Sequence, residues 1–429
     1  MRRQIEGSQA VAIAVAQCRP QVVCAYPISP QTHIVETVSR MVRTGELEGC
    51  QYVNVESEFA AMSGVIGASA VGARTWTATS SQGLLFMVEA VYNASGMALP
   101  IVMTVANRAI GAPINIWNDH SDSMSQRDSG WIQVHAADNQ DAVDLHVLAL
   151  RIAETLYVPV MVCMDGFVLT HAFEPVELPE QAQVDAFLPP FRPRQRLTPD
   201  DPVSMGAMVG PEAFTEVRVL AHERMRAAVE ILPGLAAEWG GLVGREIGTA
   251  VRPYRMDGAT TAVLALGSVV GTLQDVVDLV RDGGDDGDDG KSQPGEGTPG
   301  ETVGLIGLTL FRPFPAAEVR AALEGVRRVV VVERAFAPGA GGIVSQDVRE
   351  ALVGTGIEVQ TVVAGLGGRP VTVASLRRMV GEALAGELPA MSFLDLRQDV
   401  VDTELAVWRA GFVHAGRDLP SLQEQEVAR

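Results

Sequence analysis

The sequence predicts an α/β protein in which a doubly wound domain precedes a second, smaller α/β domain. In each half of the chain, short apolar runs rich in β-branched residues alternate with segments of helical periodicity, as they do in parallel α/β units. Between the halves, residues 188–202 carry five prolines, which can continue neither a helix nor a central strand. The chain has 429 residues, 47% of them apolar, enough to bury the cores of two or three domains.

The first half is expected to form the strands of one parallel sheet, at residues 22–26, 51–55, 75–79, 101–106 and 158–164. Turn formers and then a helical pattern follow these runs. The expected helix at residues 57–72 has small side chains at close spacing, among them Ala60, Gly64 and Gly67, which lets its backbone approach another surface. We therefore expect this helix to be buried.

The second half is expected to begin with a long helix at 212–239 and to form strands at residues 262–266, 303–308, 328–332 and 358–363. Residues 281–301 are composed almost wholly of Gly, Asp, Pro, Ser and Glu, which predicts a disordered acidic loop. We divide the chain into a first domain (1–187), a Pro-rich connector with a helical segment (188–255), a second domain (256–380) and a C-terminal tail (381–429). A helix is expected near 403–410 in the tail.

Charge and cysteine usage disfavour several classes of protein. The net charge of −19 provides no basic face for nucleic acid or for an anionic membrane, and no apolar run reaches the length of a membrane span. The amino terminus is typical of an amphipathic helix rather than of a signal peptide. The four cysteines lie far apart without a CxxC pair, which favours buried thiols over disulfides or a metal cluster. We expect a cytoplasmic protein.

The first motif with chemical content is YPISPQT at residues 26–32, directly after the first expected strand. Pro27 and Pro30 hold Ile28 and Ser29 in an extended loop at the carboxyl edge of the sheet, where ligands of open α/β sheets bind. The same spacing also suits a plain turn in which Thr32 caps the next helix.

Two charged residues also follow expected strands. Glu58 opens the small-residue helix, where a carboxylate is often only a capping residue or a partner of the helix dipole. Arg108 follows the fourth strand, and its planar fork suits either a substrate carboxylate or a structural ion pair. His120, with Asp119 and Asp122, offers types of metal ligand, but only one histidine is local and we assign no metal site there.

Taken together and in this order, the motifs resemble the separate alpha subunit of the pyruvate:ferredoxin oxidoreductase family. The resemblance covers nearly all of residues 4–380 except the acidic loop, and it is carried by EGSQA, AYPISPQT, VESEFAA, ANRAIGAPINIWNDHSDS and GLTLFRPFP. It implies a thiamine-diphosphate-binding domain of the pyrimidine type followed by a transketolase-C-like domain. It also implies oxidative decarboxylation of a 2-oxoacid, with pyruvate as the first choice, to acyl-coenzyme A and carbon dioxide, with electrons passed to ferredoxin.

The resemblance also implies roles for individual residues. Glu58 matches the glutamate that hydrogen-bonds the aminopyrimidine ring of the cofactor and favours the imino tautomer that activates the thiazolium carbon. Arg108 matches the arginine that binds the substrate carboxylate. Ser29 stands where the family commonly has a threonine that contacts the substrate, and Pro27 in the same loop is carried over as a cofactor-binding position.

The chain lacks a motif for the diphosphate and its magnesium ion, since GGDDGDDGK in the acidic loop follows an expected amphipathic helix at 273–280 rather than a strand. The resemblance therefore implies half of an active site, completed by a beta subunit that holds the diphosphate and Mg²⁺. Iron–sulfur clusters are expected in partner subunits, with gamma and ferredoxin-like delta subunits, ferredoxin as acceptor and coenzyme A as co-substrate. Open alternatives are a relative acting on branched-chain, aryl or 2-oxoglutarate substrates and a non-catalytic assembly subunit.

Overall fold

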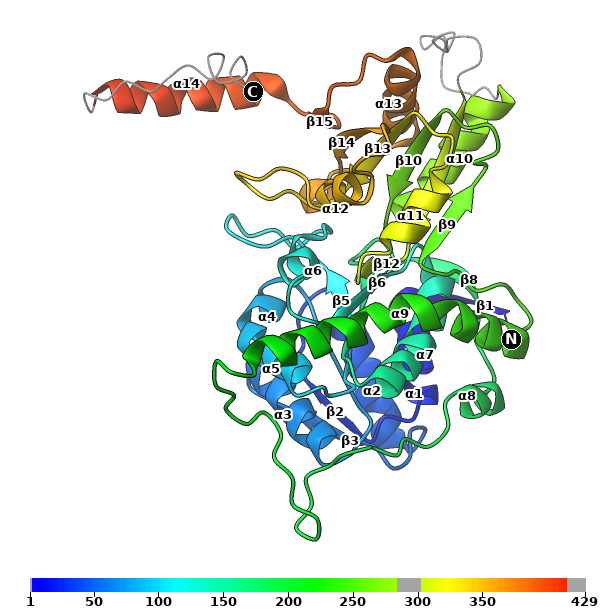
Figure 1. Cartoon of the computed structure of the whole chain (residues 1–429), viewed down its shortest axis with the longest axis vertical. Coiled ribbons are helices and arrows are strands. Elements are labelled where there is room, and N and C mark those ends of the chain that lie inside the picture. The colour runs from blue at the N-terminus through cyan, green and yellow to red at the C-terminus, as the bar shows by residue number, and fades with distance from the viewer. Residues whose placement is uncertain (1, 284–301, 415–429) are drawn as a thin grey trace.

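The computed structural model describes residues 2–283 and 302–414, which form two stacked α/β layers (Figure 1). Residues 284–301 of the expected acidic loop and residues 415–429 of the tail lie outside the described residues. Within the described ranges, none of the helices combines the length and the apolar character that a membrane span requires. The prediction of an α/β fold with two parallel sheets is confirmed.

The first layer is built on a seven-stranded sheet in the order β12-β6-β7-β5-β4-β2-β3. Neighbouring strands are parallel except that β12 runs antiparallel to β6. The five strands expected in the first half are confirmed to within two residues at each end. In chain order the members are β2 (Val22–Ala25), β3 (Gln51–Asn54), β4 (Thr75–Thr79), β5 (Val102–Asn107), β6 (Ile132–His135), β7 (Val160–Asp165) and β12 (Leu310–Arg312).

Helices cover both faces of this sheet, as a doubly wound fold requires. One face packs against α1 (Gly7–Gln17), α2 (Thr32–Thr44) and α7 (Asn139–Leu156). The other packs against α3 (Glu58–Ala70), α4 (Ser81–Phe86) and α5 (Val88–Gly96). The expectation that the small-residue helix is buried is wrong for half of its surface. In α3 the face with Met62 and Val65 is buried, whereas Ser63 and Gly67 are exposed.

A two-stranded antiparallel ribbon, β1 (Arg2–Glu6) with β8 (Phe173–Glu177), flanks this layer and was not predicted. After the short α8 (Gln181–Phe187), residues 188–213 contain neither helix nor strand, as the prolines there predict. The long helix α9 (Phe214–Val243) then crosses the first layer (Figure 1). The buried Trp239 of α9 donates a hydrogen bond from Nε1 to Asp144 of α7 over 2.8 Å.

The second layer is built on a six-stranded sheet in the order β15-β14-β13-β10-β11-β9. It is parallel except for the edge strand β9. Its members are β9 (Val251–Tyr254), β10 (Thr261–Ala265), β11 (Val303–Leu308), β13 (Arg328–Glu333), β14 (Glu358–Val363) and β15 (Met391–Phe393). The four strands expected in the second half are confirmed. Strands β9 and β15 at the two edges were not predicted.

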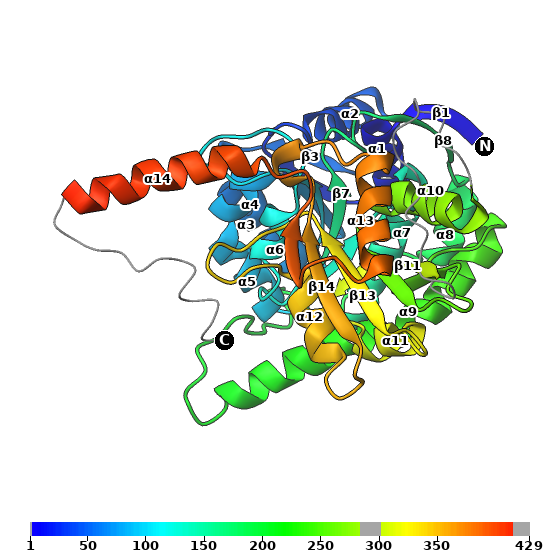
Figure 2. The ribbon, with the colours of Figure 1, turned by 90° about the horizontal axis from the view of Figure 1, so that it is seen from above.

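Helices flank this second sheet as well. One face packs against α10 (Val269–Asp282) and α13 (Val373–Ala385), and the other against α11 (Ala316–Ala322) and α12 (Val344–Ala351). The helix expected near 403–410 is the longer α14 (Gln398–His414), which projects away from both layers (Figures 1 and 2).

Buried polar groups join the two layers where the carboxyl ends of their strands meet. Asp165, which ends β7, accepts hydrogen bonds from His120 over 2.6 Å and from the backbone amide of Ser268 over 3.0 Å. It also forms an ion pair of 2.8 Å with Arg334, which follows β13. Burial alone would raise the pKa of Asp165, but the charges of His120 and Arg334 and the hydrogen bonds from His120 and Ser268 hold it well below the usual range. Strand β12 adds a second connection, because it comes from the second half of the chain.

Candidate active site

The YPISPQT loop leaves β2 at the carboxyl edge of the first sheet and is braced by the fully buried Gln31. The Gln31 amide donates to the carbonyls of Tyr26 over 2.9 Å and Ala78 over 3.0 Å, which fixes the loop to the end of β4. Ser29 is exposed at the apex. Pro27 is also exposed and lines a surface pocket of about 610 Å³ on the outer side of the loop.

Glu58 is the first residue of α3 and is only 7% exposed. The helix begins here because Ser57, in an extended conformation, caps it by accepting a hydrogen bond from the amide of Ala60 over 3.2 Å. Among the described residues, no hydrogen bond or ion pair uses the Glu58 carboxylate. A carboxylate that is nearly buried and lacks a protein partner is costly unless a ligand satisfies it.

Gly83 of α4 makes room for this carboxylate. A Cβ atom at Gly83 would lie 2.7 Å from Glu58 Oε1 and 2.5 Å from Thr79 Oγ1, closer than real Cβ contacts allow. The absence of a side chain at Gly83 therefore keeps Glu58 in its buried orientation, with α4 packed directly against it. The same short helix touches the Arg108 segment, since Ser81 Oγ donates to the carbonyl of Ala109 over 2.5 Å.

Arg108 follows β5 and is 7% exposed. Its Nη1 donates to the carbonyl of Ser29 over 2.9 Å, and its Nε donates to the carbonyl of Asn115 over 3.1 Å. Burial lowers the pKa of Arg108, and the charge of Asp122 offsets part of that effect. Within the described residues Nη2 has no hydrogen-bond partner, so one amino group of a guanidinium that is already held in place can bind an anion.

The structure thus brings Ser29 and Arg108 into direct contact. Helix α4 packs against Glu58 at Gly83 and against Ala109, the residue after Arg108, at Ser81. Ser29, Glu58 and Arg108 come from the carboxyl ends of β2, β3 and β5, the edge at which the strand pattern predicts a site. Pro27 belongs to the same loop but faces the outer pocket, which Glu6 and His33 also line.

Asp122 is a site residue whose role the sequence reasoning missed. Its buried carboxylate accepts hydrogen bonds from the amides of Ser81 over 2.9 Å and Arg108 over 3.0 Å, and from the side chain of Asn107 over 2.8 Å. Burial raises the pKa of Asp122 to about 6, although these bonds and one from the Ser123 amide oppose the shift. Asp122 therefore fixes the backbone on both sides of the proposed anion site.

Asp119 and His120, which precede Asp122, also form hydrogen bonds within the protein. Asp119 accepts from the backbone amide of Gly367 over 3.1 Å, and His120 bonds to Asp165. These contacts place residues 115–120 between the two layers, and Asn115 donates to the carbonyl of Gly367 over 3.1 Å. The structure assigns His120, Asp119 and Asp122 to the framework of the site.

All four cysteines are buried and free, as their spacing predicts. Burial raises the pKa of Cys18 to about 12 and that of Cys50 to about 11, which keeps both thiols protonated.

Comparison with known sequences identifies two matching families. Residues 13–234 match a family described as pyruvate flavodoxin/ferredoxin oxidoreductase, thiamine diphosphate-binding, and residues 297–376 match the pyruvate:ferredoxin oxidoreductase core domain II. The pyruvate synthase subunit PorA of Methanosarcina barkeri is 43% identical over 406 residues, which are 92% of this chain and 97% of that protein. The ketoisovalerate oxidoreductase subunit VorA of Pyrococcus horikoshii is 37% identical over 380 residues, 88% of this chain and 92% of that protein.

Two solved structures share the fold. A 2-oxoglutarate:ferredoxin oxidoreductase from Magnetococcus marinus, solved with 2-oxoglutarate, coenzyme A and succinyl-CoA bound, aligns with a TM-score of 0.69 and 19% identity, covering 89% of this chain and 65% of that longer chain. A split-gene transketolase, an inactive beta4 tetramer, aligns with a TM-score of 0.51 and 15% identity, covering 90% of this chain and 98% of that one.

Proposed function

This chain belongs to the pyruvate flavodoxin/ferredoxin oxidoreductase family and is the alpha subunit of a thiamine-diphosphate-dependent 2-oxoacid:ferredoxin oxidoreductase, for which we propose pyruvate as the substrate. The family match covers the first layer, where Glu58 and Arg108 lie. The observation that carries the assignment of the site is the Glu58 carboxylate, which is 7% exposed and has no protein partner among the described residues.

The residues present fit thiamine diphosphate on its aminopyrimidine side. A buried, unpaired carboxylate can hydrogen-bond a ring nitrogen and exchange a proton there, and Gly83 leaves the room that the Glu58 side chain occupies. When bound, the cofactor supplies the carbon nucleophile that attacks the keto group of the substrate. Glu58 would hold the ring and set the protonation of its nitrogen. The diphosphate and its Mg²⁺ would be held by a beta subunit.

Arg108 and Ser29 would orient the 2-oxoacid. The free Nη2 of Arg108 would bind the substrate carboxylate, while the bonds to Ser29 and Asn115 hold the guanidinium plane still. The exposed Ser29 hydroxyl would contact the same substrate. Ser29 is small and neutral, which suits pyruvate better than a dicarboxylate, because a second anion would need another cation nearby.

We also propose the partners of the chain. The relatives are named as subunits, so beta, gamma and ferredoxin-like delta subunits would complete the complex. Since the four cysteines here are buried and scattered, the iron–sulfur clusters would belong to those subunits and would pass electrons to ferredoxin. Coenzyme A would be the acyl acceptor.

The substrate proposal is tested on the complex co-purified with its neighbouring subunits. Coenzyme-A-dependent ferredoxin reduction is measured with pyruvate, 2-oxoisovalerate, an aryl 2-oxoacid and 2-oxoglutarate. We expect pyruvate to give the highest kcat/KM. A higher kcat/KM with 2-oxoisovalerate would show that the complex acts on the substrate for which the 37% identical VorA relative is named.

Replacement of Glu58 by Gln tests the catalytic assignment. Glu58→Gln keeps the shape of the side chain but cannot exchange the proton, so we expect turnover of the assembled complex to fall by about 100-fold or more. Assembly itself should be unchanged in size-exclusion chromatography. The control is Glu89→Gln, because Glu89 is an exposed glutamate in the first turn of the neighbouring α5. Normal turnover in the Glu58→Gln complex would contradict the catalytic role of Glu58 and would argue that this chain is a non-catalytic assembly subunit.

A further inference from the structure

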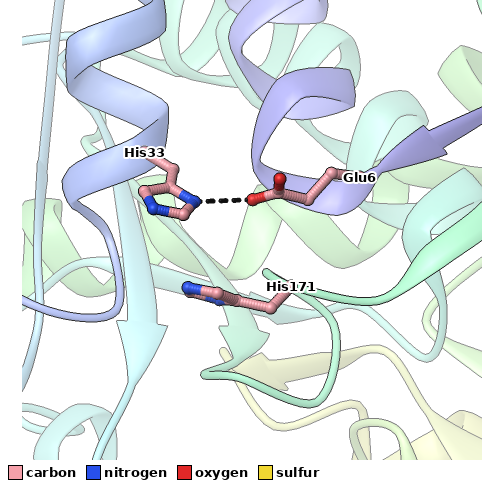
Figure 3. A group of neighbouring side chains, drawn as sticks. All are labelled: Glu6, His33 and His171. Carbon is pink, nitrogen blue, oxygen red and sulfur yellow. Dashed lines mark hydrogen bonds and ion pairs between the residues drawn. The ribbon is translucent and has the colours of Figure 1, made fainter.

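Glu6, His33 and His171 gather in one cluster of side chains (Figure 3). Glu6 and His33 line the same surface pocket as Pro27. One ligand atom from each side chain lies within 4.8 Å of the other two. His33 Nδ1 is 2.7 Å from Glu6 Oε1, and the two imidazole rings have centroids 4.7 Å apart. Among the described residues this is the only group of three or more such side chains at this spacing.

Each ligand comes from a different part of the fold. Glu6 ends β1 and precedes α1, His33 is in the first turn of α2, and His171 lies in the loop between β7 and β8. His33 follows the YPISPQT loop directly. The amino-terminal segment and the β7–β8 loop are already joined by backbone hydrogen bonds, from Gly7 to Ala172 over 3.0 Å and from Ser8 to Thr170 over 2.9 Å. A cation bound to all three side chains would add α2 to this connection.

Buried groups hold His171 in place. Thr170 is fully buried, and its hydroxyl lies 2.7 Å from His171 Nδ1. Thr170 is itself fixed, because its carbonyl accepts from the Ser8 hydroxyl over 2.7 Å. When Nδ1 donates to Thr170, the Nε2 of His171 keeps its lone pair for a ligand bond. An imidazole oriented through its second nitrogen in this way is the usual arrangement at protein metal sites.

A simple ion pair does not account for the whole cluster. An ion pair between Glu6 and His33 would explain two of the three residues. It gives no reason for a second imidazole, which becomes a like charge whenever both rings are protonated.

We propose that Glu6, His33 and His171 form a site for a zinc-type divalent cation that clamps the start of α2 to the amino-terminal ribbon and the β7–β8 loop. Two imidazoles and one carboxylate are a known zinc ligand set that leaves a fourth position open. Ligand atoms of a tetrahedral zinc site lie about 3.3 Å apart, as follows from zinc bonds of about 2.0 Å. Small side-chain rotations would bring the three groups to that spacing, and the His33 side chain, which is 50% exposed, has solvent on one side.

The side of the cluster that faces solvent supplies the fourth position. Glu6 and His33 line the surface pocket of about 610 Å³, and the His33 side chain is 50% exposed. A water molecule can therefore reach the cation. The cysteines would not compete for it, because all four are buried.

The test is a calorimetric titration of the full-length chain, free of any histidine tag and treated with chelator, with Zn²⁺. We expect one equivalent to bind and the thermal midpoint to rise, because a ligand that binds only the folded state stabilises it. His33→Gln and His171→Gln should each weaken Zn²⁺ binding by more than roughly 10- to 100-fold, which is the effect of removing only a hydrogen-bond partner of a metal ligand. His222→Gln is the control, since His222 is exposed on α9 and far along the chain.

Further titrations check the chemistry of the site. Binding of Zn²⁺ should weaken below about pH 6, as protons compete for the imidazoles. Mg²⁺ should bind more weakly than Zn²⁺, because it prefers oxygen ligands. The proposal is overturned if the full chain binds no saturable equivalent of Zn²⁺, or if His33→Gln and His171→Gln bind it as the unmodified chain does.

Discussion

At the scale of single residues, the two charged groups of the proposed site differ in how the protein holds them. In the part of the chain that the structure describes, the Glu58 carboxylate has no hydrogen-bond or ion-pair partner, whereas Arg108 donates hydrogen bonds to the carbonyls of Ser29 and Asn115. Arg108→Lys should therefore lose both the anchoring and the binding function, because an ammonium group is a single point charge. Hydrogen bonds to charged groups contribute about 1.5 to 3 kcal/mol, so we expect KM for pyruvate to rise by about 10- to 100-fold.

The kinetics that check this prediction separate KM from kcat in the assembled complex. Arg127→Lys is a matched control, because Arg127 also donates to a backbone carbonyl, that of Met124, over 3.1 Å. An unchanged KM in Arg108→Lys would contradict the assignment of the substrate carboxylate to this side chain.

Two buried histidines make the stability of the chain depend on pH. His146 lies between Thr104 Oγ1 at 2.6 Å and the Ala142 carbonyl at 2.5 Å, and burial lowers its pKa to about 4. Burial, with the charge of His120, lowers the pKa of His135 to about 3. Because the folded pKa lies below the unfolded value of about 6.5, this stability is fully present above pH 6.5 and is lost as the pH falls toward 4.

Urea unfolding of the full chain at pH 7, 6 and 5 checks the contribution of His146. We expect His146→Gln to be less stable than the unmodified chain at pH 7. The gap should narrow by about 1.4 kcal/mol for each pH unit below 6.5, because the variant has no group to protonate there. Carboxylates that titrate in the same range act on both proteins and cancel in the difference. If the free energies of unfolding of the two proteins change with pH in parallel, the pKa of His146 is not lowered by burial.

At the scale of elements, local pattern predicts strands that are buried on both faces. Strands β4, β5 and β7 are buried at every position, and their positions are confirmed. Strand β6 was missed because it alternates apolar residues with Gln133 and His135, which are buried all the same. Gln133 donates to the carbonyl of Ser123 over 2.8 Å, a contact that a pattern of hydrophobicity cannot register. Strand β12 was missed because its pairing partner lies in the other half of the chain.

The roles of Glu58 and Arg108 rest on the resemblance rather than on the residues alone, since each also has a structural reading. Asp122 was considered only as a type of metal ligand and Gly83 was not identified, because the role of each depends on distance in space. Nothing in their local sequence shows that Asp122 accepts bonds from two separate loops, or that Gly83 faces a carboxylate.

Gly83 provides a test at this scale, because α4 can keep its helix while losing the space for Glu58. An alanine here raises helix propensity, yet its Cβ would lie 2.7 Å from Glu58 Oε1. We expect Gly83→Ala to displace the carboxylate and to lower turnover by at least about 10-fold, with the complex still assembled. Gly96→Ala in the neighbouring α5 is the control, because nothing lies within 4 Å of a Cβ placed there. Equal turnover in both variants would refute the role of Gly83.

At the scale of the whole molecule, the proposed site depends on how the two layers meet. The loop that carries Asn115 is bonded to Gly367 of the second layer, and Asn115 in turn holds Arg108. Sequence patterning predicts both layers but not this junction, because the residues that form it are polar, buried and up to 252 positions apart. Buried polar groups with distant partners leave no periodic signal.

The Arg334–Asp165 ion pair is the charged centre of the junction, and its loss should weaken the attachment of the second layer. The side chains are 11% and 1% exposed, so Arg334→Leu would leave Asp165 buried with His120 and Ser268 as its remaining hydrogen-bond partners. Breaking a buried pair from one side costs about 3 to 5 kcal/mol, and the bond to His120 favours the lower value. Arg40→Leu is the control, because the Arg40–Glu46 pair is 49% exposed on both sides and should contribute less than about 1 kcal/mol. Denaturant unfolding measures the loss of free energy of unfolding in each variant. Arg334→Leu should also raise KM for pyruvate, because the junction holds Asn115 and Asn115 in turn holds Arg108. Similar losses of stability in the two variants would show that the Arg334–Asp165 ion pair does not hold the layers together.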